Sequence, residues 1–211
     1  RKARLVAHKA HRKTGRLLDI GTGTGYFADT MARRGWKVEA VEKSPQARAF
    51  AKEHFDLDVK PESALKEFAP GSFDVITLWH VMEHLEHLNE TWEMLRELLT
   101  EKGMLIVAVP NCSSYDAGRY GEYWAAYDVP RHLWHFTPVT IQQLASRHGF
   151  IMAARHPMPF DAFYVSMLSE KHRGSSCSFL KGMYAGTLAW FSTLGRKERS
   201  SSMIYVFRKK R

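Results

Sequence analysis

Three glycines at alternate positions, with an acidic residue two positions before the first of them, make one segment of this sequence well suited to ligand binding. The segment 16–20, with the apolar Leu17 and Leu18, predicts a buried strand, and Asp19 in it stands two residues before the first of Gly21, Gly23 and Gly25. A strand, a tight glycine turn and a helix N-terminus bring the backbone of α/β proteins against nucleotide-like ligands. Because glycine has no Cβ, it adopts positive φ and lets a ligand approach the backbone closely. We therefore expect a nucleotide-like ligand at this turn.

A second acidic residue stands where the sugar of such a ligand would be recognised. The segment 36–42 alternates as a strand and ends in Glu42, and a serine and a proline then open a helix over 45–54. A carboxylate at the tip of the second strand accepts hydrogen bonds from ribose hydroxyls. The alternatives are that Glu42 is a solvated strand end and that Asp19 only caps the turn.

A third segment adds side chains at the same edge of the predicted sheet. Residues 74–79 have the pattern of a buried strand of a parallel sheet, and residues 80–85 follow it. Open α/β sheets bind ligands at the carboxyl ends of their strands. We therefore expect residues 80–85 to face the ligand.

The rest of the chain alternates between strand and helix patterns, which predicts a parallel sheet covered by helices. Apolar residues recur at helical spacing over 85–99, and we expect that helix to end at Gly103. The other expected elements are strands over 104–109, 150–155 and 202–207 and a helix over 138–148.

The glycine spacing separates two classes of nucleotide site. Dinucleotide sites use G-x-G-x-x-G, whereas Tyr26 stands at the third glycine position here and the spacing is G-x-G-x-G. This pattern, with Asp19 before it, resembles motif I of the class I S-adenosylmethionine (SAM) methyltransferases. Segment 72–85 resembles their fourth-strand region, in the branch that includes the ubiquinone-biosynthesis O-methyltransferases. Residues 128–136 resemble a signature of a subfamily of unassigned substrate, and the whole resemblance covers 15–207.

The resemblance implies an α/β fold, a Rossmann-like three-layer sandwich whose seven-stranded sheet is mostly parallel with the last strand antiparallel. It also implies transfer of a methyl group from SAM to an oxygen or nitrogen of a small-molecule acceptor, with S-adenosylhomocysteine as the product. The methionyl and ribose parts of SAM would lie against Asp19, the glycine turn and Glu42, and the adenine near residues 63–65. The cofactor-binding residues expected on this basis are Asp19, Gly21, Thr22, Gly23, Tyr26, Glu42, Lys43, Ser63, Ala64, Leu65, Trp79 and His80.

The candidates for a catalytic base are histidines. An oxygen or a protonated nitrogen acceptor must lose a proton, and the pKa of histidine lies near working pH. His132 and His135 are three residues apart, so one local turn aims both in the same direction. We expect one of them to be the base, with His80 as a third candidate and a packed structural role as the alternative for each. His80 and His84 have helical spacing but no third ligand beside them, so we expect no metal site.

Length and charge indicate one domain with basic ends. The 211 residues suffice for a single domain over 1–211, and the formal net charge is +9. Ten lysines and arginines lie in 1–13 and 208–211 without an acid, so the body is close to neutral, which disfavours a nucleic-acid partner. We expect a basic N-terminal helix over 1–14. Because no signal peptide or membrane-crossing apolar run is found, we expect a cytoplasmic protein.

Two segments, 112–136 and 158–195, exceed a minimal fold of this kind, and we expect them to form lid or substrate-binding insertions. The first is rich in aromatic residues, which suits a cover that excludes water from the methyl group. In the second, the apolar stretch 176–195 is flanked by basic residues. It is expected either to pack as a lid or dimer surface or to contact a membrane peripherally, and both a monomer and a homodimer remain open.

Two other functions are alternatives to a small-molecule methyltransferase. One is a non-catalytic SAM-binding or scaffold protein, and the other is a methyltransferase acting on a nucleic-acid or lipid-linked substrate. Methyltransferases of nucleic-acid amino groups usually carry an Asn/Asp-Pro-Pro-aromatic motif after the fourth strand. This chain has Trp79-His80-Val81-Met82 at that place, which disfavours the nucleic-acid alternative.

Overall fold

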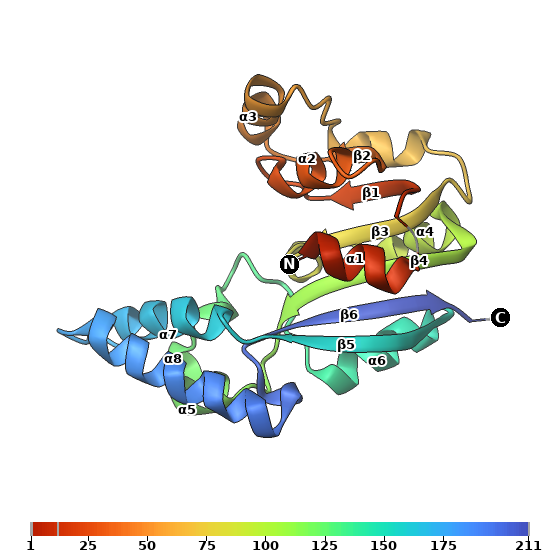
Figure 1. The fold of residues 1–211 in the computed structure, drawn as a ribbon. Coiled ribbons are helices and arrows are strands. Elements are labelled where there is room, and N and C mark those ends of the chain that lie inside the picture. The colour runs from red at the N-terminus through yellow and green to blue at the C-terminus, as the bar shows by residue number, and fades with distance from the viewer. Residues whose placement is uncertain (1, 12, 211) are drawn as a thin grey trace.

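A single six-stranded sheet forms the centre of the computed structural model, which describes residues 2–11 and 13–210 (Figure 1). Its strands are β1 (Arg16–Ile20), β2 (Lys37–Val41), β3 (Phe73–Trp79), β4 (Leu99–Pro110), β5 (Phe150–Met158) and β6 (Ser202–Lys209). Their order is β2-β1-β3-β4-β6-β5. The first four strands are parallel to one another, and β6 runs antiparallel to both β4 and β5. The last strand is therefore antiparallel in a mostly parallel sheet, as expected.

Helices cover both faces of the sheet and confirm the Rossmann-like three-layer sandwich. One face carries α4 (Leu88–Leu98) and α6 (Pro138–Arg147), and the other carries α1 (Lys2–Ala10) and α2 (Tyr26–Ala32). The remaining helices are α3 (Pro45–Phe55), α5 (Tyr115–Tyr120), α7 (Asp161–His172) and α8 (Ser178–Gly195), with short 3-10 helices η1 (Glu62–Glu67), η2 (Met82–His84), η3 (Gly121–Tyr123), η4 (Ala125–Tyr127) and η5 (Lys197–Arg199).

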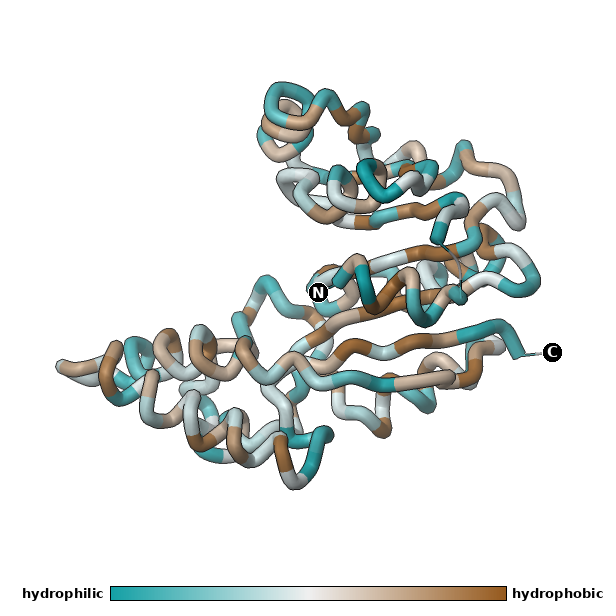
Figure 2. Tube along the Cα trace, in the orientation of Figure 1, coloured by the Kyte–Doolittle hydropathy of each residue, from teal (hydrophilic) through white to brown (hydrophobic). Residues whose placement is uncertain are grey.

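Side chains along each central strand alternate between two buried cores. Leu18 and Ile76 belong to the core under α4 and α6, whereas Leu17 and Val75 belong to the core under α1 and α2. Successive side chains of a strand point to opposite faces, so a strand buried on both faces must be apolar throughout. Figure 2 shows this as hydrophobic segments concentrated along the central strands.

The sheet has six strands in the described residues, where seven were expected. At the outer edge of β2, a seventh strand is reduced to a single parallel bridge between Val41 and Lys60. The Lys60 N–H donates to the Ala40 carbonyl, and the Glu42 N–H donates to the Lys60 carbonyl. Pro61 follows and has no N–H to donate, so the ladder stops there.

The helix expected over 85–99 ends earlier than Gly103. Leu99 already has extended backbone angles and pairs with Phe73 of β3, so α4 ends at Leu98. Gly103 lies inside β4, where an added Cβ would come 2.9 Å from the Thr100 carbonyl oxygen. Its lack of a side chain therefore permits a tight bend in β4, and it does not cap the helix.

The basic N-terminal helix is shorter than the expected span 1–14 and is not wholly solvated. Within the described residues, α1 ends at Ala10, and Ala3 and Val6 are buried in the core that it shares with α2. The prediction for residues 1 and 12 lies outside the described residues. One face of this helix thus packs on the sheet, and Arg4 lies exposed on the remainder.

The two insertions pack against each other and form a small second core. Tyr120 and Trp124 from 112–136 are buried with Val165 of α7 and Ala185 of α8. A buried carboxylate joins this core to the main sheet, because Asp116 accepts from Trp124 Nε1 at 2.8 Å and from a serine hydroxyl next to β6 at 2.6 Å. Tyr120 and Trp124 thus stabilise the insertion, and none of the described residues of 112–136 lines the pocket found at the sheet edge. The role of the segment as a lid stays a prediction.

Candidate functional site

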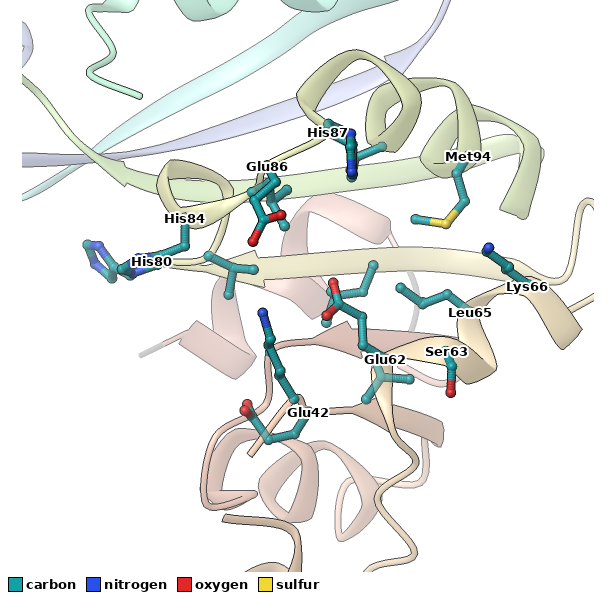
Figure 3. A pocket seen from close by; sticks show the side chains of 17 residues that line it. Glu42, Glu62, Ser63, Leu65, Lys66, His80, His84, Glu86, His87 and Met94 are labelled. Atoms are coloured by element: carbon teal, nitrogen blue, oxygen red, sulfur yellow. The ribbon is translucent and has the colours of Figure 1, made fainter. Parts of the chain in front are cut away.

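A pocket of about 650 Å³ opens where β1, β2 and β3 end (Figure 3). Its walls come from the glycine turn, the end of β2 and η1 on one side, and from η2 and the start of α4 on the other. The expected ligand-binding residues that line it are Gly21, Glu42, Lys43, Ser63, Leu65 and His80. The other expected residues, outside the lining, are Asp19, Thr22, Gly23, Tyr26, Ala64 and Trp79.

The carboxylate of Glu42 holds the glycine turn against the end of β2. Its Oε2 accepts from the Gly23 N–H at 2.8 Å, and its Oε1 accepts from the Ser44 N–H at 2.9 Å. A carboxylate oxygen has lone pairs for more than one donor, so both oxygens retain acceptor capacity toward the pocket. Glu42 therefore fixes the turn and is also available to a ligand hydroxyl.

Two glycines of the turn adopt left-handed backbone angles for different local reasons. Gly21 has φ +67°, and an added Cβ would lie 2.4 Å from Cγ2 of Val81, which lines the same pocket. Gly23 has φ +59°, but an added Cβ would meet nothing within 4 Å. Both positions thus require positive φ, which favours glycine, and of the two only Gly21 also lacks room for a side chain because Val81 lies against it.

Asp19 lies behind the pocket, on the other face of β1. Because side chains alternate, Ile20 reaches the pocket while Asp19 faces the side covered by α1. Asp19 Oδ1 accepts from the Thr77 hydroxyl at 2.6 Å, but Oδ2 is buried without a hydrogen-bond partner among the described residues. Burial raises the pKa of Asp19 to about 6, and the Thr77 hydrogen bond and the nearby Lys2 charge offset only part of that.

The ammonium of Lys2 approaches the same side of the sheet. It lies 4.5 Å from the ring centroid of Trp79, a cation–π distance. Burial lowers the pKa of Lys2, while the charges of Asp19 and Asp161 oppose that shift. Lys2 could not be connected with the site from the sequence, because only tertiary packing of α1 brings it there.

His80 is held between two carboxylates at the end of β3. Its φ of 58° is unusual for a residue with a side chain. Its Nδ1 lies 3.4 Å from Glu83 Oε1, and its Nε2 lies 3.5 Å from Asp161 Oδ2. Burial lowers the pKa of His80, but the hydrogen bonds and charges of Asp161 and Glu83 outweigh it and raise the pKa to about 9. His80 is therefore protonated near neutral pH, which removes it from the candidates for a base.

The charged His80 is expected to stabilise the protein below, but not above, its raised pKa. A histidine with an ordinary pKa of 6.5 and a folded pKa of about 9 contributes stability that is complete below pH 6.5 and is lost as the pH rises through 9. His80→Gln should therefore lower the melting temperature at pH 6 and approach wild type near pH 10. The measurement is thermal unfolding across this range, with His87→Gln as an exposed control on the same pocket rim. If the difference in melting temperature between His80→Gln and wild type did not change with pH, His80 would not be a protonated imidazolium in the folded protein.

His84 reaches the pocket, whereas the two histidines expected to act as base do not line it. The Nδ1 of His84 lies 2.9 Å from the Arg131 carbonyl oxygen, and the Nδ1 of His132 lies 2.8 Å from the Ala126 carbonyl oxygen. A neutral ring that donates from Nδ1 leaves Nε2 as an acceptor. The two rings meet edge to face at 4.6 Å. His135 is directed elsewhere, since its Nε2 lies 3.0 Å from the Tyr127 carbonyl oxygen.

A buried carboxylate adjoins this histidine pair. Oxygens of Glu83 and ring nitrogens of His84 and His132 all lie within 4.8 Å of one another. Sequence spacing did not reveal the group, because His132 comes from the insertion and reaches η2 only in three dimensions. The Glu83 carbonyl, which accepts from the N–H groups of Leu133 and Trp134, fixes that approach. The absence of a metal ion stays a prediction.

Residues 1–154 match the family described as "Methyltransferase domain". A ubiquinone biosynthesis O-methyltransferase of Schizosaccharomyces pombe is 35% identical over 101 residues, which are 44% of this chain and 37% of that protein. The chain spans between 37% and 64% of the length of such curated relatives.

Two solved structures share the fold at lower identity. Phosphoethanolamine N-methyltransferase 2 of Haemonchus contortus, solved with SAM or S-adenosylhomocysteine, has a TM-score of 0.68 and 21% identity, over 100% of this chain and 52% of that chain. The 1,6-didemethyltoxoflavin N1-methyltransferase of Burkholderia thailandensis has a TM-score of 0.63 and 15% identity, over 100% of this chain and 78% of that chain. At these identities the likeness concerns the fold.

Proposed function

Because the chain belongs to the class I SAM-dependent methyltransferase family, we propose that it binds SAM in the pocket at the carboxyl ends of β1, β2 and β3 and transfers the methyl group to a small molecule. The observation that carries this proposal is the glycine turn held by Glu42 beside an open pocket of about 650 Å³. The acceptor atom is an oxygen or a nitrogen, and S-adenosylhomocysteine is the product.

The described residues fit this cofactor at two points. The unpartnered Oδ2 of Asp19 supplies a buried negative charge near the turn, which suits the ammonium of the methionyl part. Glu42 lines the pocket and suits the ribose hydroxyls. The adenine would lie near residues 63–65, and the remaining proposed contacts are Gly21, Thr22, Gly23, Tyr26, Lys43, Trp79 and His80. When bound, SAM supplies a methyl carbon already activated by its sulfonium.

The residues of this chain would then position the acceptor, exclude water and remove a proton. Alignment of two reacting groups in a pocket is a large part of such catalysis. His84 lines the pocket, and its Nε2 has no hydrogen-bond partner among the described residues, while His132 packs against its ring edge to face. We propose this pair as the proton acceptor, with His84 nearest the substrate and His132 positioning it. His135 is the second proposed base, and it is less well supported because it does not line the pocket.

Titration calorimetry with SAM, S-adenosylhomocysteine and NADH tests the cofactor class. Binding of the first two, without heat from NADH, is the expected result. Failure of a folded protein to bind SAM would contradict the proposal. Tight SAM binding with no turnover of any oxygen or nitrogen acceptor would favour the second candidate, a non-catalytic SAM-binding or scaffold protein.

Affinity for SAM is expected to depend on the ionisation of Asp19. Its pKa is about 6 in the unliganded protein, and only the carboxylate attracts an ammonium. The dissociation constant should therefore rise as the pH falls from 7 to 5, by up to about tenfold for each pH unit below the pKa. Calorimetry at several pH values measures this, and Asp19→Asn should bind weakly with a flat profile. An unchanged slope in Asp19→Asn would assign the pH dependence to another group.

The acceptor and partners are proposed only by chemical class. The near-neutral body disfavours nucleic acid, while a small molecule or a lipid-linked acceptor suits the pocket. Both a monomer and a homodimer remain open. Among the described residues, no helix has the length and apolar character needed to cross a membrane.

A further inference from the structure

Helix α8 turns its small residues inward and its large apolar residues outward. Gly182, Ala185, Gly186 and Ala189 are buried against the rest of the protein. This is the reverse of an ordinary surface helix, whose large apolar residues face the core. The large apolar residues that α8 exposes, each by more than a third, are Phe179, Leu180, Met183, Tyr184, Phe191 and Leu194.

Close backbone packing within the α7–α8 hairpin explains this inversion. An added Cβ on Gly182 would lie 2.5 Å from the Met167 Cα, and one on Gly186 would lie 2.8 Å from the Phe163 Cα. The two glycines form a G-x-x-x-G pattern, which allows helices in lipid to approach closely. Since the inner face has no room for large side chains, the apolar residues of α8 must lie outside, where Tyr164 of α7 is also exposed.

Cations lie at both ends of α8. The three acids in residues 159–199 all have partners within the protein: Asp161 with His80, Glu170 with Tyr120, and Glu198 with Arg155. The basic residues are grouped at the hairpin tip and at the far end of α8. At the tip, a pocket of about 370 Å³ is lined by Arg119, Arg173, Lys181, Ser175 and Glu170, and the far end carries Arg196, Lys197 and Arg199.

This charge distribution opposes a second copy of the chain as the occupant of the face. A symmetric dimer presents the same patch from both subunits. Whether the two α8 helices run parallel or antiparallel, basic ends would face basic ends, which is unfavourable across an interface. An anionic surface complements both ends at once, and it also accommodates the apolar face between them.

We propose that the α7–α8 hairpin docks this protein on an anionic phospholipid surface. The apolar face of α8 enters the interface, and the cations at both ends contact headgroup phosphates, so that the helix lies along the surface. The pocket at the tip, with Arg119, Arg173 and Lys181, receives a phosphate. Asp161, in the first turn of α7, lies 3.5 Å from His80, which lines the pocket at the ends of β1, β2 and β3, so the hairpin contacts a residue of that pocket. Figures 1 and 2 show the hairpin, with its hydrophobic segments, extending from the end of the sheet.

Co-sedimentation of the full chain with phospholipid vesicles tests this inference. Vesicles that contain phosphatidylglycerol should bind the protein, those of phosphatidylcholine alone should bind it far less, and added salt should weaken the binding. Phe179→Ser with Phe191→Ser should lower the partition coefficient by about a hundredfold. The matched control is Val139→Ser with Ile151→Ser, two exposed apolar residues outside the hairpin.

A second pair of variants isolates the charges. Combined Arg119→Gln, Arg173→Gln and Lys181→Gln should weaken binding to phosphatidylglycerol vesicles by about a hundredfold, because each cation near such a surface contributes about a fivefold factor. Arg33→Gln, Arg34→Gln and Lys37→Gln remove three cations near β2 and should leave binding unchanged. Thermal unfolding of each variant verifies its fold.

Three results would overturn the inference. The first is no binding to either kind of vesicle, and the second is equal loss of binding in the hairpin variants and their controls. The third is that light scattering detects a dimer of the wild type, that the combined Phe179→Ser and Phe191→Ser variant is monomeric, and that neither protein binds vesicles. This result would show that a second copy of the chain covers the outward face of α8.

Discussion

Replacing Gly21 by alanine is expected to destabilise the protein by about 2–5 kcal/mol, the sum of two local costs. A left-handed backbone costs a residue with a Cβ about 1–2 kcal/mol. Overpacking against a neighbour costs about 1–3 kcal/mol, and here the new Cβ would stand 2.4 Å from Val81 Cγ2. Since Val81 lines the pocket, its displacement should also weaken SAM binding. Urea unfolding measures the first effect and calorimetry the second.

Gly23→Ala is the matched control, because it has nearly the same backbone angle without the contact. Its φ is +59°, and nothing lies within 4 Å of the added Cβ, so we expect only about 1–2 kcal/mol of destabilisation. The double variant Gly21→Ala with Val81→Ala should recover most of the difference between the two glycines. Equal destabilisation in both single variants would show that the packing of Gly21 on Val81 is unimportant.

The glycine turn and Glu42 could be predicted from the sequence because their signals are local. Glycines needed for positive φ and an acid ending a strand stand within a few residues of the elements that position them. The central strands were equally recognisable, because burial on both faces requires a continuous apolar run such as that of β4. Local chemistry thus predicted the pocket wall formed by β1 and β2.

The opposite wall could not be predicted, because it depends on contacts between distant segments. Asp161 meets His80 only after the hairpin folds back on the sheet, and His132 meets His84 only because the chain after η4 crosses η2. The aromatic residues of 112–136 suggested a lid, yet Tyr120 and Trp124 are buried against α7 and α8. Aromatic composition alone does not distinguish a pocket cover from a second core when the partner segment is far along the chain.

Replacing Glu42 by alanine is expected to raise the dissociation constant for SAM about 5- to 150-fold, which corresponds to about 1–3 kcal/mol. Two losses contribute, since Glu42 accepts from the Gly23 and Ser44 N–H groups and also lines the pocket. Calorimetry measures the change. Glu39→Ala is the control, because Glu39 lies on the strand that Glu42 follows, pairs with Lys60 at 2.9 Å and is outside the pocket lining.

The two roles of Glu42 can be separated with the 2′-deoxy analogue of S-adenosylhomocysteine. If Glu42 accepts a hydrogen bond from the ribose, wild type should bind the analogue about tenfold more weakly than S-adenosylhomocysteine, and Glu42→Ala should bind both alike. If Glu42 only holds the turn, removal of the hydroxyl should cost both proteins the same. Equal losses of affinity in wild type and Glu42→Ala would therefore assign ribose binding to another residue and leave Glu42 as the support of Gly23. A loss confined to wild type would show that the same carboxylate both holds the glycine turn and binds the ribose.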